Sequence, residues 1–155
     1  MRYDSNSLSV VLAPAGELAR DFDAVWDRIW RQDHVPPRAL ELCRLRLAVM
    51  HGATEEANHC RHGREVEPQR CAQVRDGSYV SSALFDDAER AVLAFAEVYA
   101  QDAAAIDDGL ADAVKHHYGD AGLVCLVESL GFIDARIRLA MMFTAIDAGF
   151  TGEAQ

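Results

Sequence analysis

The sequence lacks the features that mark several classes of protein. Its four cysteines include no CxxC pair and show no zinc-like spacing. It has no run of basic residues, and no apolar run approaches the ~20 residues of a membrane-spanning helix. Val and Ile do not alternate with polar residues, as they do in half-buried strands. We therefore expect no nucleic-acid partner, no membrane span and no β-sheet.

Positive charge is scarce except in the middle of the chain. The formal net charge is −10, and residues 76–155 carry four basic and 14 acidic side chains. Residues 38–75 are the exception, with seven basic and five acidic ones. An acidic protein is repelled by nucleic acid and by anionic membranes. The locally positive middle segment favours a small anionic substrate instead.

Helical periodicity runs through nearly all of the sequence. With 155 residues, half of them apolar, the chain is long enough for one domain with a substantial core. We interpret residues 1–14 as an N-terminal arm rather than a signal peptide, and we expect a cytoplasmic protein. The fold class that we predict is all-α. The expected helices cover residues 16–32, 37–51, 54–64, 68–75, 86–101, 106–118 and, after a break at Gly119, 121–148.

One of these expected helices lacks the apolar face by which helices dock on a core. From position 53 to position 64 the sequence reads ATEEANHCRHGR, without Val, Ile, Leu, Met, Phe, Tyr or Trp. A helix capped by Thr54 would place Glu56, His59 and Cys60 on one face. These groups suit acid/base chemistry in a pocket. The alternative is a solvated helix whose acid and imidazole face water and whose thiol is packing.

Two further interpretations concern residues in or next to that stretch. Glu41 and Arg44 lie three residues apart in a strongly apolar helix. They are either an intrahelical ion pair or a carboxylate that supports the group on the next helix. Glu56-x-x-His59, extended by His62, is also a pair typical of helical metal sites. Because no second E-x-x-H occurs, a complete ligand set is missing and we expect no metal.

The order of three segments resembles the carboxymuconolactone decarboxylase/alkylhydroperoxidase D-like superfamily. The segments are PPRALELCRLRLAVMHG before the apolar-poor stretch, FDDAERAVLAFAEVYAQD, and HYGDAGLVCLVESLGF in the last part. The resemblance covers about residues 20–149. It implies a multi-helix bundle with a long C-terminal helix, assembled as a homo-oligomer, either a trimer or a hexamer.

In the peroxidase branch of that superfamily, a C-x-x-C pair follows the glycine, and a His lies one turn further on. Aligned on Gly52, these positions hold Ala53, Glu56 and Cys60, while the Glu of that branch's proton relay matches Glu41. Both reactive cysteines are therefore replaced. The resemblance implies that the disulfide chemistry of that branch does not run here.

A second branch has the pattern C-x-Y-E-W-x-H-H, which this chain matches in part. Glu56 and His59 are kept, whereas positions 53, 55, 57 and 60 differ from the pattern. In the last helix, the same resemblance places a polar residue and an Arg near the pocket, at about Asp134 and Arg138. Arg138 is thereby a candidate to bind a substrate carboxylate, although an i, i+4 pair of this kind is more often structural.

These observations lead to one functional hypothesis and two alternatives. We expect an enzyme without cofactor that performs decarboxylation, isomerisation or a related lyase step on a small organic acid or lactone. Glu56 would transfer the proton, His59 or Cys60 would be its partner, and Glu41 would support it. One alternative is a thiol-dependent alkylhydroperoxidase that uses Cys60, although no second cysteine lies one turn away. The other is a non-catalytic binding relative.

Overall fold

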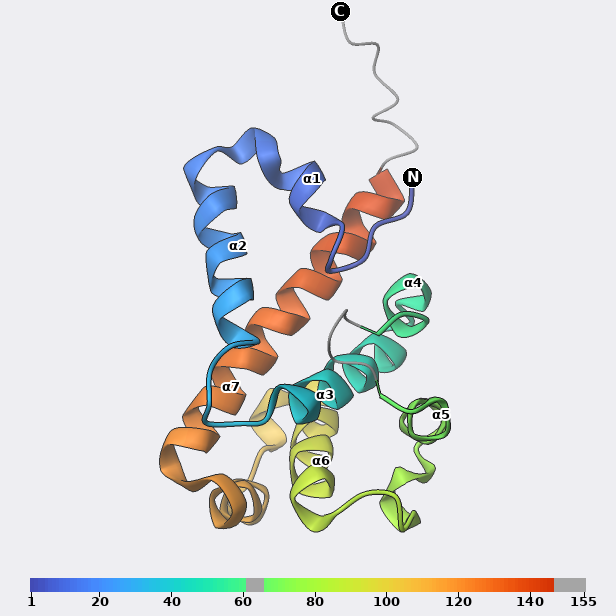
Figure 1. Ribbon diagram of the computed structural model, residues 1–155, viewed down its shortest axis with the longest axis vertical. Helices are drawn as coiled ribbons and strands as arrows, with labels where there is room; N and C mark the ends of the chain where they lie inside the picture. The colour runs from blue at the N-terminus through green and yellow to red at the C-terminus, as the bar shows by residue number, and fades with distance from the viewer. Residues whose placement is uncertain (61–65, 147–155) are drawn as a thin grey trace, which may run out of the picture.

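The computed structural model describes residues 1–60 and 66–146, and no strand occurs among them (Figure 1). The predicted all-α class is confirmed. In the described ranges the α-helices are α1 Leu8–Leu12, α2 Glu17–Ile29, α3 Pro37–Met50, α4 Thr54–Ala57, α5 Pro68–Asp76, α6 Asp87–Gln101 and α7 Asp108–Ile146. Three short 3-10 helices join them, namely η1 Ala13–Ala15, η2 Ser78–Ser81 and η3 Ala103–Ala105.

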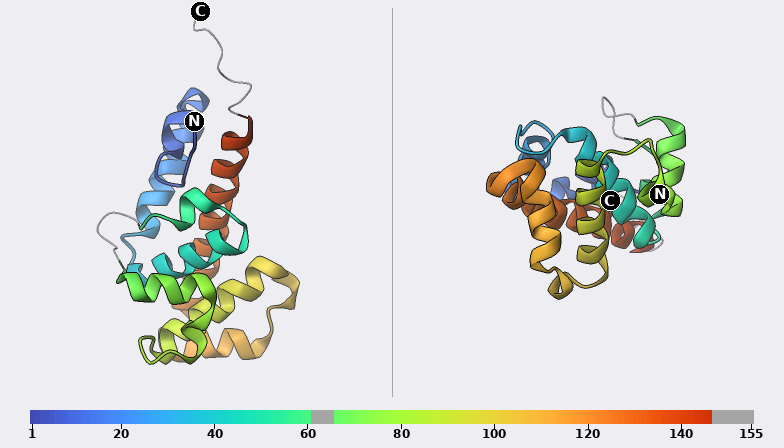
Figure 2. Two further views of the ribbon diagram at one scale, coloured as in Figure 1. Left: turned by 90° about the vertical axis from the view of Figure 1, so that its right-hand side faces the viewer. Right: turned by 90° about the horizontal axis from the view of Figure 1, so that it is seen from below.

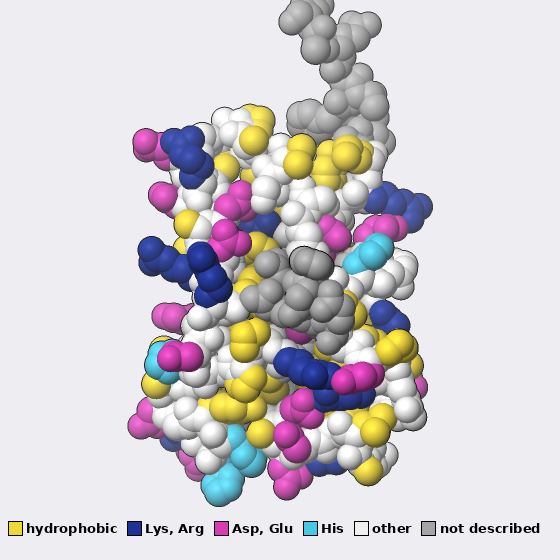
Figure 3. All heavy atoms as spheres, in the orientation of Figure 1, with side chains coloured by type: hydrophobic (Ala, Val, Ile, Leu, Met, Phe, Trp, Pro, Cys, Tyr) yellow, Lys and Arg dark blue, Asp and Glu magenta, His cyan; other side chains and the backbone are white. Residues whose placement is uncertain are grey.

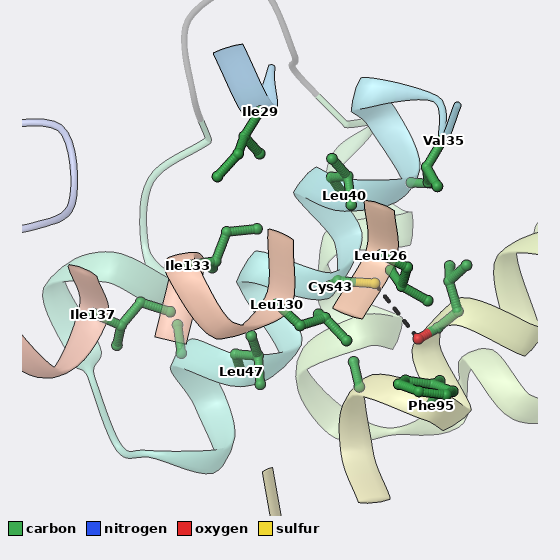
Figure 4. Packing of buried hydrophobic residues seen from close by; sticks show 14 of the residues in the cluster. Ile29, Val35, Leu40, Cys43, Leu47, Phe95, Leu126, Leu130, Ile133 and Ile137 are labelled. Carbon is green, nitrogen blue, oxygen red and sulfur yellow. Dashed lines mark hydrogen bonds between the residues drawn. The ribbon is translucent and has the colours of Figure 1, made fainter. Parts of the chain in front are cut away.

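Helix α3 is the central element of the fold. It packs against α4, α5, α6 and α7, and most of its side chains are buried. A helix that is apolar on most sides must be covered on all of them, and the surrounding helices provide that cover. Figure 4 shows Leu40, Cys43 and Leu47 of α3 among side chains of α6 and α7, including Phe95 and Leu130.

The longest helix, α7, consists of two helical parts. Gly119, with φ 69° and ψ −177°, interrupts it, which confirms the predicted break. This backbone conformation is accessible almost only to glycine. The second part runs beside α1 and α2 (Figure 2), and residues of α2 and α7 meet in the ring contact between Phe22 and Phe132.

Two predicted helix ends are confirmed by their hydrogen bonds. Gly52 has φ 67° and follows the last residues of α3, where the Ala53 N–H donates to the Ala48 carbonyl at 2.8 Å. At the start of α6, Asp86 and Glu89 form a reciprocal capping box: each side chain accepts from the other residue's N–H.

The predicted helix over residues 54–64 is wrong in its extent. Helix α4 ends at Ala57, and its N-cap is Ala53 rather than Thr54. Its last carbonyls bind side chains instead of continuing the helical ladder. Arg75 donates twice to the Ala57 carbonyl, at 3.0 and 2.8 Å, and Arg44 donates to the Glu56 carbonyl at 3.0 Å. These arginines satisfy the helix end early, and no apolar face is present to dock a longer helix.

Parts of two predicted helices lie outside the described residues. Positions 61–65 belong to the apolar-poor stretch and include His62, and positions 147–148 belong to the expected end of the last helix. The predicted N-terminal arm, residues 1–14, contains α1 and the start of η1. It contacts α4 and α7 through Ser5, which is fully buried.

The surface agrees with the charge pattern of the sequence. In Figure 3, Lys and Arg side chains occur singly or in small groups beside Asp and Glu. Within residues 1–60 and 66–146, none of the helices is both long enough and apolar enough to span a membrane.

Candidate functional site

A buried network of charged side chains connects α3 to α4. Arg44 Nε and Nη2 donate to the two carboxylate oxygens of Glu41 at 2.9 and 2.6 Å. Arg44 Nη1 donates to Glu56 Oε1 at 2.5 Å. The three side chains are 1%, 0% and 2% exposed, respectively. Burial opposes the charge of Arg44, but the hydrogen bonds and charges of Glu41 and Glu56 outweigh it and raise the pKa of the guanidinium. Arg44 is therefore a permanent cation between two carboxyl groups.

The N-terminal arm closes over Glu56 through a single residue. The Ser5 N–H donates to Glu56 Oε2 at 2.5 Å, and the Ser5 hydroxyl donates to Oε1. The Ser5 carbonyl in turn accepts from Nε and Nη2 of the buried Arg136, at 3.1 and 2.8 Å. The guanidinium of Arg136 lies 4.7 Å from the Trp26 ring centroid, which fixes it against α2. Ser5 thus links α4 to the middle of α7.

Glu56 lies in the wall of a cavity of about 350 Å³. Residues of the arm, of α4 and of the C-terminal part of α7 line this cavity, which is open to solvent. One side carries the apolar groups of Ile137, Ala140 and Met141, and the other carries the backbone and side chains around Glu56. The complete lining is Arg2, Tyr3, Gly52, Ala53, Thr54, Glu55, Glu56, Ile137, Ala140, Met141, Thr144 and Ala145.

The other two members of the predicted face do not join Glu56. His59 is exposed, and its Nδ1 binds the Glu55 carbonyl at 2.8 Å. Cys60 lies beyond the helix and packs against a second core cluster, next to α5. Neither residue lines the cavity. The expectation of one shared helical face is wrong because the helix ends before His59.

The structure brings Cys60 close to a second cysteine. Its Sγ lies 3.7 Å from the Sγ of Cys71 in α5. No sequence pattern predicts this contact, because the two cysteines lie eleven positions apart and form no CxxC pair. The sequence shows only that no second cysteine lies one helical turn from Cys60, and the neighbouring thiol comes from α5 instead.

Asp134 and Arg138 form the predicted pair, but at a different place. Arg138 Nε donates to Asp134 Oδ2 at 2.9 Å, and Asp134 Oδ1 contacts Nε2 of His51 at the end of α3. Burial and the nearby Asp134 carboxylate raise the pKa of Tyr99. Arg138 is 62% exposed, and neither it nor Asp134 lines the cavity beside Glu56. The sequence does not identify His51, the partner of Asp134, because a histidine at a helix end forms no functional motif by itself.

A second and larger cavity, of about 830 Å³, lies between α2 and α7. Its wall includes Arg28, His34 and Glu128 but none of the predicted site residues. No cluster of three or more His, Cys, Asp or Glu side chains suited to a metal ion occurs in the described ranges 1–60 and 66–146. Glu56 and His59 bind separate partners there and do not form a ligand pair.

Comparison with known proteins gives no family assignment. No protein-family model matches the chain, and no curated protein matches it significantly. The function of the site is therefore inferred from the contacts, burial and charges of its side chains.

Proposed function

We propose that the protein is an enzyme without cofactor that transfers a proton to and from a small organic molecule bound beside Glu56. The observation that carries this proposal is the position of Glu56, a buried acidic residue that lines the cavity. Decarboxylation, isomerisation and a related lyase step all need such a transfer. Glu56 is the base, and Glu41 and Arg44 position it.

The hydrogen bonds of Glu56 leave capacity for a substrate. An ionised carboxylate has about four acceptor positions. Ser5 occupies two of them and Arg44 a third. These three contacts leave one acceptor position, on Oε2, for a proton of a bound substrate. Because the donors lie on α3 and on the arm, they hold the carboxylate in one orientation.

The charges of the cavity favour a neutral substrate over an acid. Two carboxylates, Glu55 and Glu56, lie in its wall, and the guanidinium of Arg2 is bound to Glu55 at 2.6 Å. A substrate carboxylate would have to displace that pair and approach Glu56. The apolar side of the cavity suits a hydrocarbon ring. A lactone, with a carbonyl group that acidifies the neighbouring C–H bonds, fits both conditions.

The proposed function differs from the sequence-based hypothesis in three respects. The substrate is neutral rather than anionic, because Glu55 and Glu56 both line the cavity. His59 and Cys60 do not take part, because neither borders the cavity. Arg138 does not bind the substrate, for the same reason. A thiol-dependent hydroperoxidase reaction at the Glu56 cavity is disfavoured, since Cys60 points to α5 instead.

The experiment uses five-membered unsaturated lactones, both neutral and carboxylate-substituted, with the full-length protein in D₂O. Proton NMR follows exchange of the carbon-bound protons next to the carbonyl and any isomerisation or loss of carbon dioxide. Methyl spectra of the protein report binding at Ile137, Ala140 and Met141. We expect neutral lactones to shift these methyl signals and to exchange ~10²–10⁴-fold faster than in buffer. Binding in the cavity without faster exchange of any lactone would leave only a binding protein and overturn the enzymatic proposal.

A further inference from the structure

Two thiols, one after α4 and one in α5, lie next to each other near the network of Glu41, Arg44 and Glu56. Cys60 follows α4, Cys71 lies in α5, and their Sγ atoms are 3.7 Å apart. We propose that Cys60 and Cys71 form a reversible redox site, in which a small disulfide compound oxidises the two thiols to an intramolecular disulfide bond. This site lies outside the cavity, and its existence does not depend on the enzymatic proposal.

The local geometry allows the bond with a small movement. A disulfide bond is about 2.05 Å long, so the two sulfur atoms have to approach each other by less than 2 Å. Cys71 is fixed, because it lies in a helix and its thiol donates to the Val66 carbonyl at 3.4 Å. Cys60 lies in irregular backbone after α4. Its side chain can therefore approach without breaking a helical hydrogen bond.

The unequal burial of the two thiols sets the order of the reaction. Cys60 is half-buried, whereas Cys71 is buried. Burial, reinforced by the hydrogen bond with Cys60, raises the pKa of the Cys71 thiol to about 11. Cys71 is therefore protonated at neutral pH and screened from reagents. Cys60 is the thiol that an external disulfide reaches first.

The oxidation takes place in two thiol–disulfide exchange steps. The Cys60 thiolate attacks one sulfur of the external disulfide, forms a mixed disulfide, and releases one thiolate of the reagent. Cys71 loses its proton and attacks the Sγ of Cys60, and the second thiolate leaves. Two protein thiols have been oxidised, and one disulfide has been reduced to two thiols. An excess of small thiol reverses both steps.

The other two cysteines provide internal controls. Cys43 is fully buried and its thiol contacts the Val92 carbonyl at 3.6 Å (Figure 4). Cys125 is half-buried like Cys60, but its neighbour is the Ser129 hydroxyl at 3.9 Å. A reagent that reaches Cys125 can form a mixed disulfide there, but no second thiol is in place to resolve it.

The disulfide bond would form in a region whose backbone is already held by arginines of α3 and α5. The carbonyl of His59, next to Cys60, accepts from Arg44 Nη2, and Arg75 in α5 holds the Ala57 carbonyl. The negative charge of Glu41 contributes to the raised pKa of the Cys71 thiol. Oxidation would therefore fix the segment after α4 against α5, at the edge of the buried network.

The test equilibrates the full-length protein with mixtures of reduced and oxidised glutathione, followed by acid quenching, alkylation and peptide mass spectrometry. The variants are Cys60→Ser, Cys71→Ser and the control Cys125→Ser. We expect a Cys60–Cys71 cross-link in the wild type and in Cys125→Ser. Cys71→Ser should instead accumulate a mixed disulfide at Cys60, and Cys60→Ser should form no intramolecular bond.

The fold, rather than closeness in sequence, should promote the bond. In urea, a short flexible loop gives an effective thiol concentration in the millimolar range. We expect the effective thiol concentration to be at least ~10-fold higher in buffer than in urea. The oxidised protein should also have a melting temperature ~5–10 °C higher than the reduced protein, because the disulfide bond closes a short loop. Equal effective concentrations in urea and in buffer, or a stable mixed disulfide at Cys60 in the wild type, would overturn the proposal.

Discussion

Arg44 is the residue on which the buried network depends. It is the cation between Glu41 and Glu56, and it also donates to the main chain of Glu56. A buried ion pair has little net effect on stability relative to well-packed apolar groups, because desolvation offsets the attraction. Removing one partner is different, since it leaves buried charge without compensation.

We expect Arg44→Met to reduce the free energy of unfolding by about 3–5 kcal/mol, because two buried carboxylates lose their common cation. Urea denaturation at neutral pH measures the change. Adding Glu41→Gln and Glu56→Gln to that variant should recover a large part of the loss, since the uncompensated charge is then gone. A loss below ~1 kcal/mol in Arg44→Met would contradict the burial of the network.

The sequence identified some individual residues of the candidate site and missed others. Glu41 and Glu56 stand out because acids are unusual in an apolar helix and in a stretch without apolar anchors. Ser5 and Arg136 could not be found in this way. Their contacts join positions 51 and 131 residues apart, and nothing local in the sequence encodes such a pairing. The contact between Cys60 and Cys71 spans only eleven positions, but it depends on how the segment after α4 packs against α5.

At the scale of helices, prediction succeeded where the local signals agree. The periodic pattern, the capping box at Asp86 and the glycine break at Gly119 all correspond to observed features. Helix α4 is the exception, because its end is set by Arg44 and Arg75 from other helices. A helix whose length depends on distant side chains cannot be delimited from its own sequence.

Gly119 provides a test of that helix break. A Cβ atom added there would meet no atom within 4 Å, so the effect of Gly119→Ala is purely conformational. We expect a loss of about 1–3 kcal/mol in unfolding free energy, because alanine is strained at this φ and ψ. Thermal and urea denaturation measure it.

The matched control is Gly131→Ala, in the helical interior of α7, where a Cβ atom would lie 3.9 Å from the Tyr99 hydroxyl. That variant should gain about 0.5–1 kcal/mol from higher helix propensity. Similar effects of the two substitutions would argue against the interruption of α7 at Gly119.

Across the described chain, several large apolar side chains of α7 are exposed. Exposed fractions there range from 38% to 57%, for Met141, Ile146, Val127, Met142 and Val124. Exposed apolar side chains on one helix indicate a surface for association. We therefore keep the homo-oligomer as a proposal, and a trimer or hexamer is what the family resemblance implies.

Light scattering at micromolar concentration tests this prediction. The expected mass is three or six times the 17.0 kDa of one chain. Val124→Asp combined with Val127→Asp should lower that mass, because charges on the contact surface must be desolvated on association. A wild-type mass of 17.0 kDa would refute the prediction, and an unchanged oligomer in the double variant would place the interface elsewhere.

Glu56 is the residue that carries the proposed chemistry, and its neighbour in the cavity wall provides the control. Glu55 lines the same cavity but is 34% exposed and paired with Arg2. The decisive measurement is the rate of lactone proton exchange in D₂O for Glu56→Gln and Glu55→Gln, beside the wild type. We expect Glu56→Gln to lower the rate by ~10²–10⁴-fold while the protein stays folded, and Glu55→Gln to lower it by less than ~10-fold. An unchanged rate in folded Glu56→Gln would contradict the claim.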